Sequence, residues 1–444
     1  MKAHHKLTRR DFLISAGATL AGTALAACSP RPTDEPTAPA QVSKEPVTIT
    51  VAYWAVEAHM VGMNQVVDAF NAAHPGITME VLVPPVGEYF QKLLSMYAGG
   101  EGPDILYTPG YWFPTALSKN VVRDVDEYIQ RDGWNTDMYY SVVLDSFKSD
   151  GKVYGVPWVW ATNHIFWNKT LFDELDVEYP ATSLDDDSWT WDKFVEVSKQ
   201  LTTVDDSGAP ATFGFNLPIK HWSWPRILTW ENGGGILSED MKQCIVNHPE
   251  SVEALQWAVD LQRVHGVLPT VAGGVGTDIP NFQTGKIGMD LTAAPVISAW
   301  WDLDFEWDVA HNPIGPEGQS CTLSPEAFVM AKDCEHPDEA WEVLKFLGSA
   351  EAQEIQARNM RSMPAVVSVA EGDTFLPADK PPMHKEVLWE TLEYAREPVY
   401  PPFWGELRTI IANEIEPAFY EGKDVQAAAD AMCEQVETLI AEAE

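Results

Sequence analysis

Apolar and polar positions along the chain follow two different periods, and their order predicts the first part of the fold. Residues 47–54 and 77–83 alternate with a period of two, which is typical of strands. Between them, apolar residues from Met63 to Phe70 have helical spacing, and a His-Pro-Gly turn ends that helix. A second helical stretch and a short apolar segment, 103–108, follow. Strand, helix, strand, helix and strand in this order predict a parallel sheet with right-handed crossovers.

Four later stretches have the spacing of amphipathic helices. They are 190–201, with Thr190 as the N-cap, 251–266, closed by a glycine, 336–355, and a C-terminal stretch from Val425 to Leu439. With 444 residues the chain is too long for one compact core, so we expect two domains of α/β class.

The N-terminus has the pattern of an export signal. A basic start precedes an apolar run over residues 12–27, which is shorter than the ~20 residues that span a membrane. "TRRDFL" (8–13) resembles a twin-arginine signal, and "LAAC" (25–28) resembles a lipobox in which Cys28 becomes the lipidated first residue. We therefore expect residues 1–27 to be a signal peptide and the protein to be exported and lipid-anchored at the extracytoplasmic face of the cell membrane.

Residues 28–46 are rich in proline, threonine and serine, as expected of a flexible tether. The formal charge of the whole chain is −37, and without residues 1–27 the chain has 25 basic and 65 acidic residues, or −40. Such a charge repels phosphate backbones and argues against nucleic-acid binding.

The remaining cysteines give no sign of a metal or a cofactor. Cys244, Cys321, Cys334 and Cys433 lack CxxC spacing and a nearby histidine pair, which argues against a zinc site. An oxidising compartment permits disulfides, whereas a chain of this size is stable with buried thiols, so both states stay open.

Aromatic side chains point to a binding function. The chain has 18 tryptophans, and Trp158, Trp160 and Trp167 crowd into one segment without a nucleophile. One face of a sugar ring consists of C–H groups that pack on aromatic rings, while its hydroxyls need directional polar partners. The composition is therefore suited to holding a carbohydrate.

Eight short landmarks, spread over most of the exported part, resemble the bacterial extracellular solute-binding proteins, and specifically the carbohydrate-binding family that serves ATP-driven importers. They are "GGEGPDIL" (99–106), "YGVPW" (154–158), "FWNKTLFDEL" (166–175), "SWTWDKF" (188–194), "WENGGGIL" (230–237), "FQTGKIGMDL" (282–291), "HPDEAWEVLKFLGSAEAQ" (336–353) and "RSMPA" (361–365).

The resemblance implies a periplasmic-binding-protein fold: two α/β lobes, each a mostly parallel sheet flanked by helices, with the ligand cleft at the hinge. One lobe would comprise residues 47–158 and 312–348, and the other 159–311 and 349–444. The chain would cross between lobes near 159–163, near 311–313 and after the helix that ends near Leu347. It also implies a monomer without catalytic activity that delivers its solute to ABC permease subunits.

Candidate ligand-binding residues come from positions that this fold brings to the cleft. Trp54 ends the first strand, and ligands of such sheets lie beyond the carboxyl ends of the strands. The loop 111–113 follows the third strand, and Trp222 and Trp224 are expected on one side of an extended segment. The full set is Trp54, Asp104, Trp112, Trp158, Trp160, Trp222, Trp224, Glu231, Asn232, Trp300, Arg361 and Trp404.

Two other functions remain open on the sequence. Arg226 and Arg361 are suited to pairing with a carboxylate or phosphate, so the same fold would serve a peptide or charged metabolite, while the acidic surplus would suit a polyamine. A secreted glycoside hydrolase needs two acids that flank the scissile bond, and acids are plentiful here. The order of elements, however, differs from the eight βα units of the usual barrel hydrolases.

Overall fold

The computed structural model describes residues 46–54, 57–269, 281–359, 362–398 and 400–443. These residues belong to one compact unit, Glu45–Glu444. The signal peptide, the tether and Cys28 lie outside the described residues, as does Arg361. In the described part of the chain, no helix is both long and apolar enough to cross a membrane.

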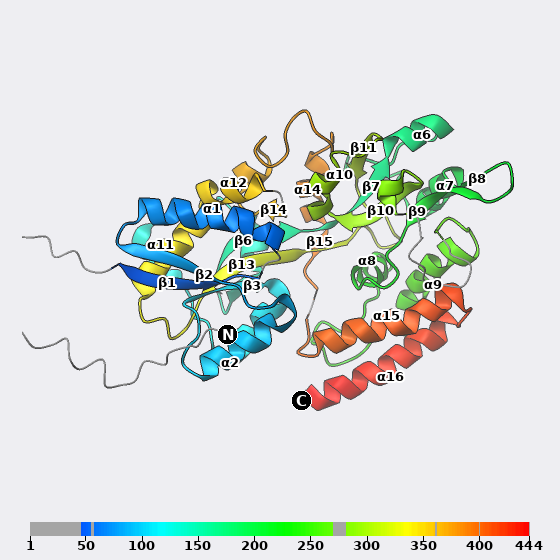
Figure 1. Cartoon of the computed structure of the whole chain (residues 1–444). Helices are drawn as coiled ribbons and strands as arrows, with labels where there is room; N and C mark the ends of the chain where they lie inside the picture. Colours follow the sequence, from blue (N-terminus) through cyan, green and yellow to red (C-terminus); the bar gives the residue numbers. More distant parts are fainter. Residues whose placement is uncertain (1–45, 55–56, 270–280, 360–361, 399, 444) are drawn as a thin grey trace, which may run out of the picture. The chain divides into compact units, whose positions relative to one another are not determined.

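The first sheet has six strands in the order β14-β6-β13-β3-β1-β2 (Figure 1). Its parallel part confirms the predicted strand–helix order, because β1 pairs in parallel with both β2 and β3. The later strand β13 returns antiparallel between β3 and β6. The strands are β1 (Val47–Ala52), β2 (Ile77–Leu82), β3 (Ile105–Pro109), β6 (Gly155–Ala161), β13 (Ser324–Met330) and β14 (Met363–Pro364).

Helices from both ends of the chain cover this sheet. The predicted helices α1 (Glu57–Ala73) and α2 (Tyr89–Ala98) are present. Helix α11 (Pro337–Leu347) packs on β1, β6 and β13, and α12 (Ala350–Ala357) packs on α1. The apolar stripe of α11 is fully buried, as its spacing predicts, because it faces the sheet.

The second sheet has five strands in the order β11-β7-β10-β9-β8. Strand β10 is parallel to β9, whereas β7 is antiparallel to both of its neighbours. Both sheets are therefore mixed rather than mostly parallel as expected, because β13 runs antiparallel in the first sheet and β7 and β8 run antiparallel to their neighbours in the second. The strands are β7 (Asn163–Asn168), β8 (Thr203–Val204), β9 (Pro210–Asn216), β10 (Ile287–Ala293) and β11 (Trp307–Ala310).

Long helices pack around the second sheet. Helix α7 (Trp191–Gln200) begins as predicted at Thr190, whose side chain accepts a hydrogen bond from the Lys193 amide at 3.3 Å. Helices α15 (Trp404–Tyr420) and α16 (Val425–Ala443), orange and red in Figure 1, pack on each other and on α9 (Pro249–Arg263). Helix α8 (Ser223–Glu231) also packs on α9.

The remaining elements are short. The helices are α3 (Phe113–Ser118), α4 (Asp126–Asp132), α5 (Ser141–Asp145), α6 (Lys169–Leu175), α10 (Ile297–Trp300), α13 (Val367–Ala370) and α14 (Glu386–Glu390). Single 3₁₀ turns cover Val86–Glu88, Gly110–Trp112, Phe282–Thr284, Ala294–Val296 and Thr391–Glu393. Two strand pairs complete the fold: β4 (Lys148–Ser149) with β5 (Lys152–Val153), and β12 (Cys321–Thr322) with β15 (Ala395–Arg396).

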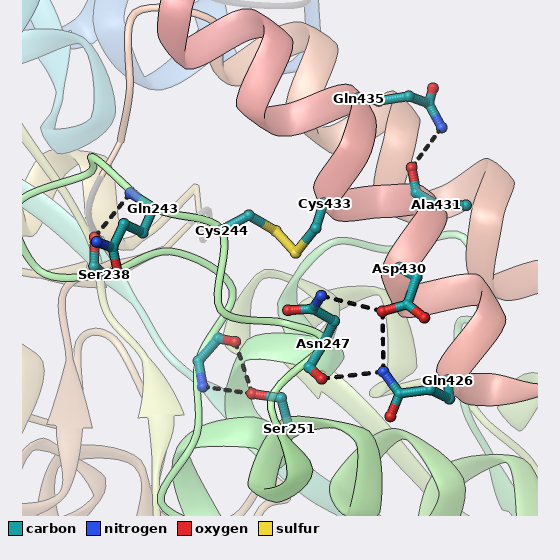
Figure 2. The surroundings of a disulfide bond; sticks show 11 residues. Ser238, Gln243, Cys244, Asn247, Ser251, Gln426, Asp430, Ala431, Cys433 and Gln435 are labelled. Carbon is teal, nitrogen blue, oxygen red and sulfur yellow. Dashed lines mark hydrogen bonds between the residues drawn. A yellow bond between two sulfur atoms is a disulfide. The ribbon is translucent and has the colours of Figure 1, made fainter.

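One disulfide fastens the C-terminal helix, a question that the sequence left open. Cys244 bonds to Cys433 on α16, with a Cα–Cα distance of 5.2 Å (Figure 2). Next to it, Asn247 donates to the Asp430 carboxylate at 3.1 Å, and Gln426 donates to the Asn247 carbonyl at 3.1 Å. Cys321 is a buried free thiol, and Cys334 is a half-buried one.

The chain leaves the first sheet later than the boundary that we expected at 348–349. Strand β14 pairs with β6, so Met363 and Pro364 still belong to the first sheet. The buried Gln353 explains this arrangement, because its amide donates to the Pro157 carbonyl at 3.0 Å and accepts from the Val366 amide at 2.8 Å. A buried amide that both donates and accepts in this way holds a segment in one place.

Candidate functional site

A row of aromatic rings begins beyond the carboxyl ends of β1 and β3. Trp54 lies two residues after β1 and Tyr111 two residues after β3, which is the sheet edge where ligands of parallel sheets bind. The two rings meet edge to face with centroids 6.5 Å apart. Phe90 supports both rings from α2, at 6.0 Å from Trp54 and 5.8 Å from Tyr111.

The row continues onto the C-terminal part of the chain. Tyr111 contacts Tyr400 edge to face at 5.6 Å, and Tyr400 contacts Trp404, the first residue of α15, at 5.1 Å. Trp222 lies 5.1 Å from Trp404 and 6.4 Å from Tyr400, again edge to face. We call Trp54, Tyr111, Tyr400, Trp404 and Trp222 the aromatic row. Trp54, Tyr111 and Trp222 are half-buried and offer apolar surface from segments next to both sheets, while Tyr400 and Trp404 are buried and join them.

Arg226 lies against the second half of this row. Its guanidinium carbon is 4.0 Å from the ring centre of Trp404, 5.1 Å from Trp222 and 5.6 Å from Tyr400. Helix α8 explains the contact with Trp222, because residues four apart lie on one face of a helix. The side chain is 3% exposed, and burial lowers its pKa to about 10, so the group stays charged at neutral pH.

Two further side chains flank this end of the row, a charged arginine and a neutral histidine. Arg408, one turn along α15, lies 6.0 Å from the Trp404 ring and is exposed. The His221 ring stacks on Trp222 at 5.4 Å. Desolvation, and then the charge of Arg408, lower the pKa of His221, so this ring is neutral at physiological pH.

A cavity of about 450 Å³ adjoins the row at His221. The end of β9 and helix α15 contribute to its walls, with Asn216, Pro218, Lys220, Glu416 and Tyr420 among the lining residues. Lys220 and Glu416 form an ion pair at 3.0 Å across it. Through His221, which stacks on Trp222, the row neighbours a space that has both apolar and polar walls.

Four of the predicted residues belong to this region. Trp54, Trp222 and Trp404 are members of the aromatic row, and Trp112 lies behind it, stacked on Phe90 at 4.6 Å. In the loop 111–113, Tyr111 rather than Trp112 contacts the row, because Trp112 points into the core of the first sheet.

Three predicted tryptophans are core residues in this structure. Trp158 and Trp160 are at most 1% exposed, because β6 has neighbouring strands on both sides and cores on both faces. The Trp160 indole donates to the Pro364 carbonyl at 3.0 Å. Trp300 stacks on Phe282 at 4.5 Å and is also buried.

The expectation for Trp222 and Trp224 was wrong in its local structure. The segment is the start of helix α8 rather than an extended strand, so the two side chains diverge instead of sharing a side. Trp224 is fully buried against Phe419, and its indole donates to the Ile219 carbonyl at 3.1 Å. Only Trp222 lies in the row.

The predicted polar residues hold backbone and core groups instead. Asp104 lies at the amino end of β3, and its carboxylate accepts from the Thr50 amide and hydroxyl, both at 2.8 Å. Buried Glu231 accepts from the Trp191 indole at 2.8 Å, and burial raises its pKa well above the ordinary value. Asn232 donates to the Glu250 carbonyl at 2.7 Å.

Neither the position of Tyr400 in the row nor the burial of Arg226 was predicted from the sequence. The contact of Arg226 with Trp222 could have been predicted from their spacing of four residues, but only after the segment is recognised as helical. Tyr400 had no such signal, because only the return of the chain from α14 to α15 brings its ring against Tyr111.

The described residues hold no cluster of three or more His, Cys, Asp or Glu side chains suited to a metal ion. What they do hold is an aromatic surface, a buried cation and a neighbouring cavity. These groups can bind a solute, and their arrangement on an α/β fold is open to comparison with known proteins.

Residues 54–354 match the family described as bacterial extracellular solute-binding protein. This chain belongs to that family. A Brucella abortus chain named as a binding protein is 25% identical to this solute-binding protein over 390 residues, 83% of this chain and 89% of the relative. The galactooligosaccharide-binding protein of Bacillus subtilis is 22% identical over 376 residues, 81% of this chain and 80% of the relative.

Among solved structures, an ABC substrate-binding protein of Listeria monocytogenes in complex with cycloalternan resembles this solute-binding protein with a TM-score of 0.74. The identity is 24%, and the alignment covers 89% of this chain and all of the other. This likeness shows the fold: two α/β lobes, here built on the two mixed sheets.

Proposed function

We propose that this solute-binding protein captures a saccharide between its lobes and delivers it to the permease subunits of an ABC importer. The observation that carries the proposal is the aromatic row. Its rings supply faces for the C–H surface of a sugar, while Arg226 and the polar groups of the neighbouring cavity serve hydroxyls. The names of the Bacillus and Listeria proteins agree with a carbohydrate ligand.

In this proposal one lobe contains the first sheet and the other contains the second. The crossings are the link between β6 and β7, the segment after β11, and β15 rather than the end of α11. The contact between Tyr111 and Tyr400 would then lie across the cleft. A solute that touches both lobes favours the closed state, and the permease distinguishes that state from the open one.

The proposed role involves binding without chemistry, by a monomer that needs no cofactor. Polyamines fit the row less well than sugars do, because Arg226 and Arg408 repel a cation. A hydrolase would need two facing acids at the row, and the buried predicted acid Glu231 is engaged with Trp191 instead.

Binding tests the proposal directly. We would follow the melting temperature of the purified chain from Ser29 onward with oligosaccharides, amino acids and polyamines, because a solute that binds only the folded state raises it. We expect a rise with one class of saccharide, and the sugar should be recovered unchanged. Rises with amino acids or polyamines alone would contradict the proposal, and cleaved sugar would identify an enzyme.

We also propose that residues 1–27 are removed on export, that Cys28 carries the lipid, and that residues 28–46 hold the lobes off the membrane. In a bacterial host, Cys28→Ser should move the protein from the membrane fraction to the soluble fraction. Replacing Arg9 and Arg10 by lysine should block export through the twin-arginine route, whereas Lys6→Arg should leave it unchanged. Fractionation and immunoblotting measure both effects.

A further inference from the structure

We infer that the saccharide bound at the aromatic row carries a carboxylate, and that the guanidinium of Arg226 pairs with it. The inference rests on the proposed function and adds the chemical class of the sugar. A uronate residue within an oligosaccharide has the required combination of a sugar ring and a planar anion.

The first observation is a buried cation without a counter-ion. Arg226 is 3% exposed, and no carboxylate forms an ion pair with it within the described ranges. Its Nη1 atom has no hydrogen-bond partner there and is shielded from solvent. A buried charge without a partner is costly, so a built site of this kind indicates that a ligand supplies the partner.

The rings around Arg226 do not replace an acceptor. Trp404, Trp222 and Tyr400 lie within 5.6 Å of the guanidinium carbon and compensate part of its charge through their π faces. The N–H donors of a guanidinium lie in its plane and match the two oxygens of a carboxylate. The rings thus hold the guanidinium group in place and leave its N–H donors free to bind an anion.

The second observation concerns the surrounding charge. The whole chain carries −37, yet Arg408 near the Trp404 ring also forms no ion pair with any described residue. Lys220, at the other side of His221, is by contrast neutralised by Glu416 at 3.0 Å. Two unneutralised arginines on one tryptophan, in a protein with a large excess of acids, favour an anionic ligand over a neutral one.

An acid near the row, Glu397, does not change this balance. Glu397 lies beside Gly110 and interacts with Tyr400. Its side chain is accessible but crowded by protein, and the resulting desolvation raises its pKa to about 7. It therefore carries only part of a negative charge at neutral pH, and no ion pair joins it to Arg226 in the described structure.

Matched sugars test the inference. We would measure calorimetric affinities for galactotriose and trigalacturonate, and for cellotriose and its C6-carboxylated counterpart, with sugar phosphates, glutarate and free amino acids alongside. We expect at least one uronate to bind about 10-fold to 100-fold more tightly than its neutral partner, as expected of a charge-assisted bidentate pair.

The outcomes separate the two proposals. Tighter binding of a neutral sugar, or of a sugar phosphate, would overturn the carboxylate while leaving saccharide capture in place. Binding of glutarate or amino acids without any sugar would overturn the proposed function itself. Absence of binding by every uronate overturns the inference, whatever else binds.

Variants locate the effect at Arg226. Arg226→Met keeps the length of the side chain, and we expect it to lose about 100-fold in affinity for the uronate and only about 10-fold for its neutral partner, which loses a hydrogen-bond donor but no charge pair. Arg226→Lys should be intermediate. Arg358→Met, at the residue that follows α12, is the control and should change neither affinity.

A folded Arg226→Met protein that keeps its uronate preference would contradict the assignment. Melting curves check folding of each variant. If Arg226→Met does not fold, Arg408→Gln provides the test. Removing this exposed neighbouring charge should reduce the uronate preference about 3-fold, because its longer-range attraction is lost. An unchanged preference would count against the basic site.

Discussion

The same type of side chain occupies two different environments in this protein. One pair of tryptophans, Trp158 and Trp160, lies on β6. The other pair, Trp222 and Trp404, lies beside α8 and α15. The first pair belongs to a central strand, so both its sides face covered surfaces and the rings fill two separate cores. The second pair lies at element ends, where rings meet Tyr400 and a charged guanidinium.

The difference shows that the density of tryptophan along a sequence does not mark a binding site. On β6, which is covered on both faces, a bulge at Trp158 breaks the alternation, so two rings that are two residues apart enter different cores. At the end of a helix a ring has neighbours on fewer sides, so Trp222 stays half-buried, whereas Trp404 beside it is 9% exposed. Mutations should therefore separate stability from affinity between the two regions.

The largest effect is expected in the core. Trp158→Ala removes a ring that is 1% exposed, so it should lower the free energy of unfolding by about 3–5 kcal/mol through lost burial and the cavity left behind. Urea unfolding followed by circular dichroism measures this change. The folded fraction should keep its affinity for the solute, and a loss of affinity with intact stability would reverse our assignment of the two regions.

The disulfide lies outside both tryptophan regions and should affect stability alone. Replacing Cys244 and Cys433 together by serine should lower the free energy of unfolding by about 2–4 kcal/mol, because the unfolded chain regains the freedom of a loop of 189 residues. Cys334→Ser, which removes a free thiol, is the control. Unchanged urea midpoints in the double variant would show that α16 is held by its packing.

The aromatic row should show the opposite behaviour. Trp222→Ala removes a half-buried ring, and we expect about 10-fold to 100-fold weaker solute binding, or roughly 1.5–3 kcal/mol, with little change in melting temperature. Trp257→Ala is a matched control, since this ring is also half-buried but stacks on Trp191 away from the row. Titration calorimetry compares the two, and equal losses would argue against the row as the binding surface.

The smallest effect concerns a buried carboxyl in the second sheet. Burial raises the pKa of Asp290 on β10 from 3.8 to about 7, and the Asn216 amide, a donor at 3.2 Å, opposes this only in part. The folded state therefore favours the protonated acid, and this stabilisation is lost as pH rises from about 4 through 7.

Asp290→Asn should accordingly be more stable than the native chain at pH 8, by on the order of 1–2 kcal/mol, with the difference shrinking towards pH 5. Asp308→Asn is a contrasting control, because its carboxylate accepts hydrogen bonds from the Met383 and His384 amides and its loss should destabilise. Thermal unfolding across this pH range measures both. A constant difference between the Asp290 variant and the native chain would show that Asp290 is ionised throughout.

Local patterns in the sequence were sufficient for the elements that depend on neighbours along the chain. The periods of two and 3.6 predicted β1, α1, β2, α2 and β3, and the Thr190 cap began α7. They failed at residues 222–224, where two tryptophans two apart look like one face of a strand but helix α8 begins. A short apolar repeat does not distinguish these two conformations without its packing partners.

What the sequence by itself determined is the order of strands and helices, the buried helix stripes and the membership of a family of solute-binding proteins, because all three follow from residues close together or from landmarks in order. Only the tertiary structure decided which tryptophans are core, that Tyr111 meets Tyr400, and that Cys244 bonds to Cys433. These features join residues that are far apart in the chain. Their contacts depend on how the late strands and C-terminal helices return to the two sheets, which no local pattern encodes.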